Sequence, residues 1–194
     1  MQIVSFREEA VPPDLRVQVL HLHAQAWPPA DTSPAATAGA LAHDPELRPL
    51  SMLLVEGRIV LAVLDILSKQ IAHAGHRYAA GGLSTVVTRR EARGRGHGRR
   101  LVAAARDMMI AQGLDLGLFT CDRPLQAFYE SAGWRLLPGT VLIGGTPSAP
   151  FPSDQPGFGK VTMAGFFSPL ARREQASFHY ARVGLYPGEI DRLW

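Results

Sequence analysis

The sequence is poor in several residue types, and each shortage excludes a class of protein. It has one cysteine, Cys121, so no disulfide can form within the chain, and a cytoplasmic location is the simplest expectation. Its longest apolar stretches, such as residues 59–67, are too short to cross a bilayer and include Asp65. The N-terminus has no basic region followed by an apolar region, so we expect neither a signal peptide nor a membrane partner.

Net charge is also low, and the basic residues are unevenly spread. The chain has 20 basic and 17 acidic residues, a formal charge of +3, and only Lys69 and Lys160 are lysines. A nucleic-acid-binding protein usually has a larger basic excess or a clear basic stripe, so we expect no nucleic-acid partner. The dense basic cluster at residues 89–100 favours a small anionic ligand instead.

Apolar residues, in contrast, are plentiful, at 46% of 194 residues, which is enough for a compact domain with a substantial core. Periodicity and turn residues predict an order of β-α-α-β-β-β-α-β-α-β-β, a mixed α/β arrangement. The predicted strands are 2–6, two within 50–73 that are joined at Glu56-Gly57, one that ends at 85–88, and 114–120, 134–145 and 160–167. The predicted helices are 12–27, 35–44, 99–113, 122–133 and 169–182, and residues 146–159 are predicted to be a Pro/Gly/Ser-rich loop.

The segment "RGRGHGRR" at residues 93–100 allows several interpretations. An RNA-binding Arg-Gly tract would lie in a long polar segment, but here a β-branched strand and an amphipathic helix flank the glycines. A dinucleotide-binding loop needs a small residue where Arg99 stands, and a phosphate-binding Walker loop needs Gly-Lys-Ser/Thr. A turn with solvated arginines remains open. Alternating glycines before a helix, however, also leave bare amides that bind anions.

Two segments together resemble the GCN5-related N-acetyltransferase (GNAT) family. "LSTVVTRREARGRGHGRRLVAAARDM" contains Arg93-x-x-Gly96-x-Gly98, which is similar to the family's acetyl-CoA motif. "DRPLQAFYESAGWRLL" at 122–137, about 30 residues further on, resembles the family's second motif. The resemblance implies a single GNAT-like N-acetyltransferase domain over 1–194, with core motifs at 80–138 and a C-terminal extension at 168–194. It also implies a central mixed, mostly antiparallel sheet, splayed between its fourth and fifth strands and flanked by helices.

The resemblance further implies acetyl-CoA as the co-substrate and no metal. It places the pyrophosphate on the backbone amides of 94–99 and the pantetheine arm along 86–88, with an amide at Val87 or Thr88 polarising the thioester carbonyl. Tyr129 stands where the family has a tyrosine that donates a proton to the leaving thiolate. The predicted acetyl-CoA residues are Val86, Val87, Thr88, Arg93, Gly94, Arg95, Gly96, His97, Gly98 and Arg99.

A general base is less evident. Many family members have a glutamate on the fourth strand, but Ser84 stands near that place in this sequence. His73 and His76 flank the start of the strand, and nothing nearby supports a metal site. Cys121 could carry an acyl group, although a small buried residue is the favoured interpretation.

The acceptor is expected to be a primary amine of a small molecule. The long loop, the late strand and the C-terminal tryptophan resemble the aminoglycoside 2′-N-acetyltransferases, in which acidic groups bind a cationic sugar. Asp31, Asp154, Asp191 and the carboxylate of Trp194 are the candidate acceptor contacts, together with Ser84. A protein N-terminus or lysine as acceptor, a non-catalytic acyl-CoA-binding or sensing module, and a homodimer contact through the tail remain open.

Overall fold

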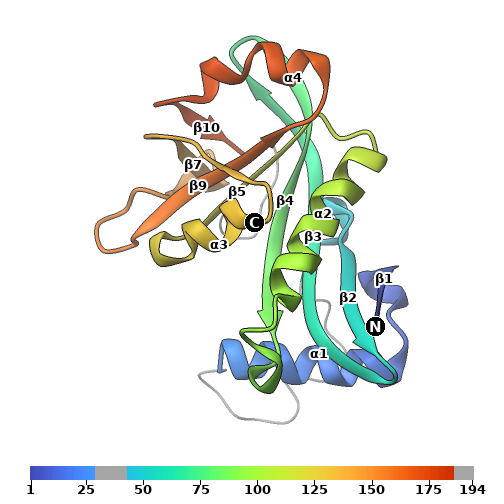
Figure 1. The fold of residues 1–194 in the computed structure, drawn as a ribbon. Coiled ribbons are helices and arrows are strands. Elements are labelled where there is room, and N and C mark those ends of the chain that lie inside the picture. Colours follow the sequence, from blue (N-terminus) through green and yellow to red (C-terminus); the bar gives the residue numbers. More distant parts are fainter. Residues whose placement is uncertain (29–42, 186–194) are drawn as a thin grey trace.

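The computed structural model describes residues 1–28 and 43–185, which are organised around a seven-stranded sheet (Figure 1). The strand order is β1-β2-β3-β4-β5-β9-β6, and neighbouring strands are antiparallel except β4 and β5. The strands of this sheet are β1 (Gln2–Arg7), β2 (Leu50–Glu56), β3 (Ile59–His73), β4 (His76–Thr88), β5 (Leu116–Asp122), β6 (Arg135–Leu136) and β9 (Lys160–Phe166). This confirms the predicted mixed, mostly antiparallel sheet.

Helices and a smaller sheet complete the fold. The helices are α1 (Pro13–Ala26), α2 (His97–Ala111), α3 (Gln126–Ser131) and α4 (Pro169–Arg173). Short 3-10 turns are η1 (Glu8–Ala10), η3 (Pro45–Leu47), η4 (Arg90–Ala92), η5 (Arg123–Leu125) and η6 (Gln175–Phe178). The second sheet has the order β10-β7-β8, with β7 (Val141–Thr146), β8 (Ala149–Pro152) and β10 (Arg182–Gly184).

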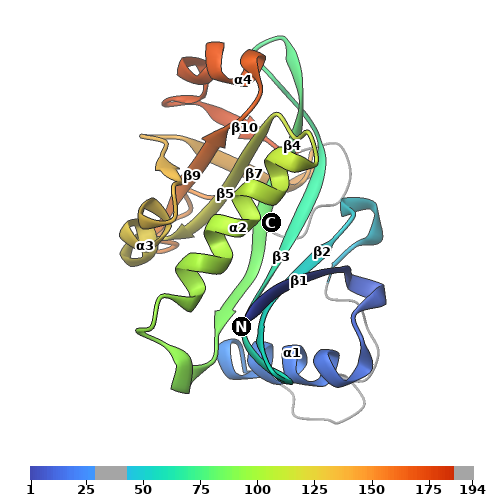
Figure 2. The same cartoon turned by 45° about the vertical axis from the view of Figure 1, so that its right-hand side comes forward.

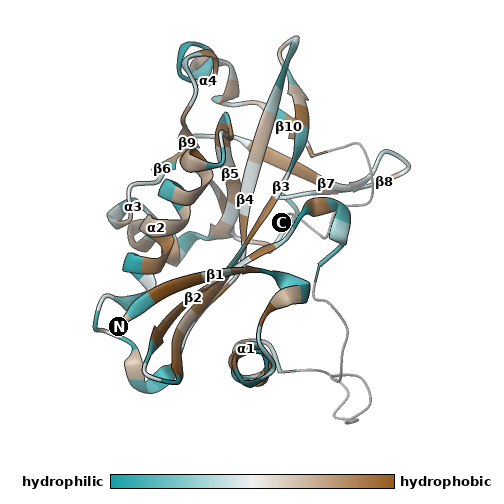
Figure 3. Ribbon diagram, turned by 90° about the vertical axis from the view of Figure 1, so that its right-hand side faces the viewer, coloured by the Kyte–Doolittle hydropathy of each residue, from teal (hydrophilic) through white to brown (hydrophobic). Residues whose placement is uncertain are grey.

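The two longest helices cover opposite faces of the large sheet (Figures 2 and 3). Successive residues of a strand point to opposite faces. Leu53 of β2 accordingly shares a buried cluster with Leu22 of α1, whereas Leu54 shares a different cluster with Leu101 of α2. The central strands are therefore almost continuously apolar, because both of their faces are covered.

The β4 and β5 strands separate after a short parallel pairing. Only Ala80 and Gly81 of β4 pair with β5, while β4 continues to Thr88 against β3. The register between β3 and β4 shifts between Val63 and Asp65, and Thr85 opposite this shift has a φ of 49°. Such a bulge bends and twists a strand, so it directs β4 away from β5. The predicted splay between the fourth and fifth strands is confirmed.

Three glycines stand side by side where these strands part. Gly81, Gly117 and Gly165 are direct partners across β4, β5 and β9. The buried indole of Trp134 lies against the second and third of them, because a Cβ would come within 2.5 Å of it on Gly117 and 3.6 Å on Gly165. The "GW" pair of the second motif thus packs on the base of the splay.

The C-terminal third departs from the predicted elements. The strand predicted over 134–145 is two strands in different sheets, since Pro138 and Gly139, which has a φ of 64°, turn the chain between them. The predicted loop at 146–159 contains β8, which forms a hairpin with β7. The predicted helix at 169–182 is one short helix, a 3-10 turn and β10, which pairs with β7. Of the helix predicted over 35–44, only residues 43 and 44 are described, and neither is helical.

Candidate functional site

A cavity of about 670 Å³ lies where the C-terminal end of β4, the following loop and the start of α2 face α3. The splay leaves this end of β4 without a β5 partner. The lining residues are Ala26, Val86, Val87, Thr88, Ala92, Arg93, Gly94, Gly96, His97, Gly98, Arg99, Leu125, Phe128, Tyr129 and Ser131. Both sequence motifs therefore contribute to one cavity.

Nine of the ten residues predicted to contact acetyl-CoA line this cavity, and so does Tyr129. The exception is Arg95, which lines an adjoining hollow of about 540 Å³ together with Gly96, His97 and Arg99. Gly96, His97 and Arg99 therefore border both spaces, while the exposed Arg95 borders only the second.

The start of α2 is built to present backbone amides. Gly96 is the N-cap, with a φ of 78°, and no side chain caps the helix. Gly94 also has a positive φ, of 75°, a region that favours glycine strongly. The Nε atom of Arg93 donates to the carbonyl oxygen of Thr88 at 3.1 Å, which ties the loop to the end of β4. Uncapped amides at the positive end of a 15-residue helix attract negative charge.

Gly98 sets the spacing between the helix and the strand. A Cβ at this position would lie 2.8 Å from Oγ1 of Thr88 and 3.3 Å from Cζ of Phe128. Because both neighbours also line the cavity, the close approach of α2 to β4 depends on this glycine. The third glycine of the motif is therefore required by packing, whereas Gly94 and Gly96 are required by backbone conformation.

Tyr129 and Cys121 are buried near one another. Tyr129 packs edge-on against Phe119 and Phe128, each with ring centroids 5.0 Å away. Burial, and then the neighbouring Cys121 and Asp122, raise the pKa of the Tyr129 phenol, so it remains protonated and able to donate. Burial and Asp122 likewise raise the pKa of the Cys121 thiol to about 11. A protonated thiol is a poor nucleophile, which argues against an acyl-carrier role.

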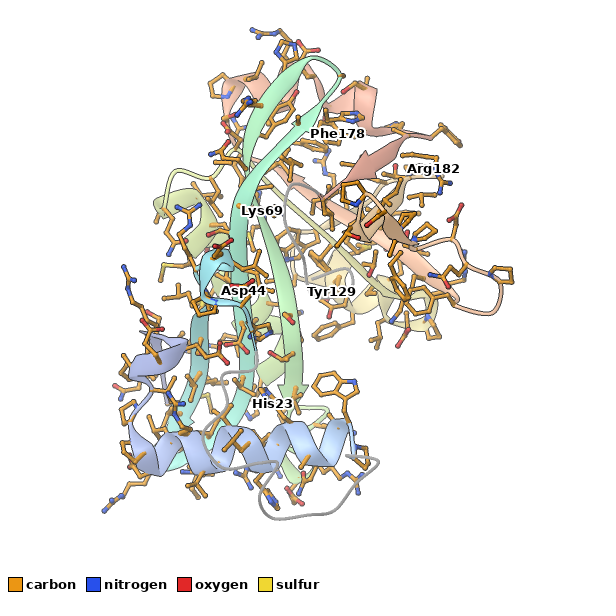
Figure 4. All side chains as sticks on the ribbon, turned by 180° about the vertical axis from the view of Figure 1, so that it is seen from behind. His23, Asp44, Lys69, Tyr129, Phe178 and Arg182 are labelled. Atoms are coloured by element: carbon orange, nitrogen blue, oxygen red, sulfur yellow. The ribbon has the colours of Figure 1, made fainter. Side chains whose placement is uncertain are left out.

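A polar cluster on the α1 side of the sheet was not anticipated from the sequence. Ser84 Oγ lies 2.9 Å from Nε2 of His43, whose Nδ1 lies 3.4 Å from Oε2 of Glu8. Figure 4 looks at this side, with His23 rising from α1 and Asp44, next to His43 in the chain, beside β3. No local pattern points to this cluster, because 35 or more positions separate each pair of the three residues along the chain.

The other predicted polar residues have different surroundings. His73 and His76 stand at the hairpin end of β3 and β4, where Nε2 of His73 lies 2.9 Å from the backbone oxygen of Ser177. His76 precedes Ser84 by eight residues on β4, and His73 lies across the hairpin turn at the end of β3. Neither residue lines the cavity. Asp154 accepts a hydrogen bond from Arg182 at 2.8 Å, which lowers the pKa of its carboxyl group. The predicted acceptor contacts Asp31, Asp191 and Trp194 lie outside the described residues.

The described residues offer neither a metal site nor a membrane span. Among them, no group of three or more histidine, cysteine, aspartate or glutamate side chains could hold a metal ion. None of its helices has both the length and the apolar character needed to span a bilayer.

Known proteins provide an independent comparison. No curated protein matches the sequence. Among solved structures, Escherichia coli ElaA is 15% identical, with a TM-score of 0.55 over 84% of this chain and 97% of that one. An aminoglycoside 6′-N-acetyltransferase from Enterococcus faecium is 16% identical, with a TM-score of 0.56 over 87% and 98%. An aminoglycoside 6′-N-acetyltransferase complexed with coenzyme A is 14% identical, with a TM-score of 0.58 over 87% and 98%.

At such identities these structures show a shared fold. Residues 11–137 match the family model described as an acetyltransferase (GNAT) domain, a span that includes both motifs and more than half of the chain. The chain therefore belongs to the GNAT family of acetyltransferases.

Proposed function

We propose that the protein transfers the acetyl group of acetyl-CoA to a primary amine of a small molecule. The observation that carries the proposal is the cavity in which the uncapped start of α2, the open end of β4 and Tyr129 meet. A donor with a pyrophosphate at one end and a thioester at the other suits a cavity that is cationic at the α2 loop and apolar beside α3.

The proposed donor position follows from the charge and the free strand edge. The amides of 94–99 and the side chains of Arg93 and Arg99 hold the pyrophosphate. The pantetheine amides pair with residues 86–88, because β3 occupies one edge of β4 there and β5 has left the other. This orientation directs the thioester toward Tyr129.

The proposed reaction is a direct attack. The amine lone pair adds to the thioester carbonyl carbon, and a backbone amide at Val87 or Thr88 stabilises the oxyanion. The C–S bond then breaks, and Tyr129 donates its phenolic proton to the departing thiolate. Burial keeps that proton on Tyr129 until the thiolate develops beside it.

Molecules with several amino groups are the proposed acceptor class: the amine that reacts is neutral, and the other, protonated amines carry the positive charge. Two of the structural neighbours are aminoglycoside 6′-N-acetyltransferases, whereas the tail and loop resemble the 2′ enzymes. Both act on amino sugars, so aminoglycosides belong among the first compounds to be tried. Asp31, Asp191 and Trp194, which lie outside the described residues, remain the proposed contacts for such a cation.

The test is a CoA-release assay with a thiol reagent over a panel of aminoglycosides, polyamines, simple primary amines and peptides with free N-termini or lysines. We expect release with at least one amine, above the rate of acetyl-CoA hydrolysis without acceptor. Binding of acetyl-CoA with no release from any amine would favour the non-catalytic acyl-CoA-binding alternative, which the absence of a fourth-strand acid motivates. If acetyl-CoA does not bind, the cavity has been assigned to the wrong ligand.

A further inference from the structure

A buried polar cluster lies on the side of the large sheet that α1 covers. Asp65 and Ser84 are direct partners across β3 and β4, and directly opposed residues share a face of a sheet. That face is the one on which Val63 and Val87 pack with α1. Asp65 and His43 are 2% and 5% exposed, whereas Ser84 is only half-buried. Of these three side chains, Ser84 is thus the one that reaches solvent.

The contacts within the cluster form a linear chain. Nε2 of His43 lies 2.9 Å from Oγ of Ser84, and Nδ1 of the same ring lies 3.4 Å from the Glu8 carboxylate. With the ring proton on Nδ1 facing Glu8, Nε2 is the acceptor and the Ser84 hydroxyl is the donor. At this distance the Glu8 charge favours that tautomer and stabilises the ring when it gains a second proton.

Other charged groups pack around this chain and set its electrostatics. Asp65 accepts hydrogen bonds from Ser51, at 2.5 Å, and from Thr85. His23 and Arg16 of α1 line a small cavity with Glu8 and Asp65. Burial lowers the pKa of His23, which the Asp65 and Glu8 charges only partly oppose, so His23 tends to be neutral and adds little positive charge beside His43.

The position of Ser84 connects the chain to the proposed reaction. Ser84 is two residues before Val86 on β4, which corresponds to about 7 Å along a strand. It lies in the part of β4 that has no β5 partner, next to the bulge at Thr85. Ser84 does not itself line the donor cavity, so an amine that attacks a thioester held at 86–88 would reach the Ser84 hydroxyl through a bridging water.

We propose that Ser84, His43 and Glu8 form a proton relay that removes the proton from the attacking amine. This inference rests on the proposed acetyl transfer. As the N–C bond forms, the amine proton passes to Ser84 Oγ while the Ser84 proton passes to Nε2 of His43. Glu8 stabilises the resulting imidazolium. After C–S cleavage His43 returns its proton to solvent, and Tyr129, which protonated the thiolate, regains one.

The relay assigns the base to residues that the strand sequence does not reveal. A carboxylate on β4 would take up the amine proton by itself. Here β4 supplies only the Ser84 hydroxyl, and the group that takes up the proton is the His43 ring that contacts it. Burying a histidine and a carboxylate together is costly unless they are paired, and a simple structural hydrogen bond to Ser84 would not require an ionisable partner.

The test compares His43→Gln with the matched control His76→Gln, which changes a histidine at the far hairpin. Gln can still hydrogen-bond Ser84 but cannot take up a proton near neutral pH. We expect kcat/KM of His43→Gln to fall about 10²-fold at neutral pH, with acetyl-CoA affinity unchanged. Protonation of the acceptor amine lowers kcat/KM toward acidic pH in every variant; the wild type and His76→Gln should show a second, imidazole step on top of this decline, and His43→Gln should lack that second step.

A second pair of variants keeps the proposal testable if His43→Gln folds poorly. Ser84→Ala should lower kcat/KM comparably, whereas Ser84→Thr, which keeps the hydroxyl, should stay within about tenfold of the wild type. Retention of the imidazole step in His43→Gln, or equal effects of Ser84→Ala and Ser84→Thr, would overturn the relay and leave the acetyltransferase proposal standing. Absence of CoA release from the wild type with every amine would overturn both.

Discussion

Substituting Gly98 by alanine should weaken acetyl-CoA binding mainly through its steric contact with Thr88. The new Cβ would lie 2.8 Å from Oγ1 of Thr88, about 0.6 Å closer than the 3.4 Å at which ordinary contacts begin. Thr88 is β-branched and stands in a strand, so its side chain has few alternative rotamers. The start of α2 must then move away from β4, and the amides proposed to hold the pyrophosphate move with it.

The magnitudes show which measurement is informative. Overpacking of this kind costs about 1–3 kcal/mol, but alanine favours a helix over glycine by about 1 kcal/mol. The net loss of folding free energy is therefore small, about 0–2 kcal/mol. The helix preference of alanine does not offset the loss of binding. We therefore expect acetyl-CoA affinity to fall about tenfold, which is about 1.4 kcal/mol of binding free energy.

The assay is calorimetric titration of acetyl-CoA in a double-mutant cycle with Thr88→Ala. Removing Oγ1 removes the clash, so Gly98→Ala should have little effect in the Thr88→Ala background. Gly113→Ala is the matched control: this glycine follows the other end of α2 with a φ of 73° and no neighbour within 4 Å, so it should lower stability without changing affinity. An equal loss of affinity in both Thr88 backgrounds would refute the reasoning.

Three further predictions use other parts of the site. Tyr129→Phe should lower kcat about 10²-fold while acetyl-CoA affinity changes little; unchanged turnover would remove Tyr129 from the mechanism. Gly117→Ala should lower the free energy of unfolding by about 3 kcal/mol, measured by urea titration, and by much less with Trp134→Phe; equal losses would exclude the indole contact. Cys121 is buried with a raised pKa, so stability is retained below pH 9 and falls toward pH 11; Cys121→Ala should flatten that decline in urea midpoints, and an unchanged decline would contradict the assignment.

The sequence predicted most of the sheet and the donor cavity because the relevant signals are local. Apolar runs on either side of Glu56-Gly57 defined β2 and β3 closely and the sequence located the end of β4, while the glycine spacing before α2 reflects backbone conformations that neighbouring residues do not alter. The prediction for the C-terminal third was wrong where short segments take their structure from distant partners. The β10 strand, for example, has three residues and exists because it pairs with β7.

The polar cluster illustrates the same limit for function. Ser84 is a candidate from the sequence only because it stands near the place of the family's glutamate. None of the residues next to it in the sequence points to His43 or Glu8. The three meet because β1 and its following turn, the segment before β2, and β4 converge on one side of the sheet. Contacts of this kind depend on topology, so a motif search along the chain does not find them.

The place of β9 has a consequence for how the protein is made. This late strand inserts between β5 and β6 and pairs with all seven residues of β5. During synthesis about 44 residues, from the end of β5 to the end of β9, must be added before the edge of β5 can pair. At usual elongation rates this takes roughly 2–9 s. An apolar strand edge exposed for that long is a template for association with other chains. A nascent chain, or a fragment that ends with the second motif, should therefore depend on a chaperone to stay monomeric, although it already contains every residue of the donor cavity.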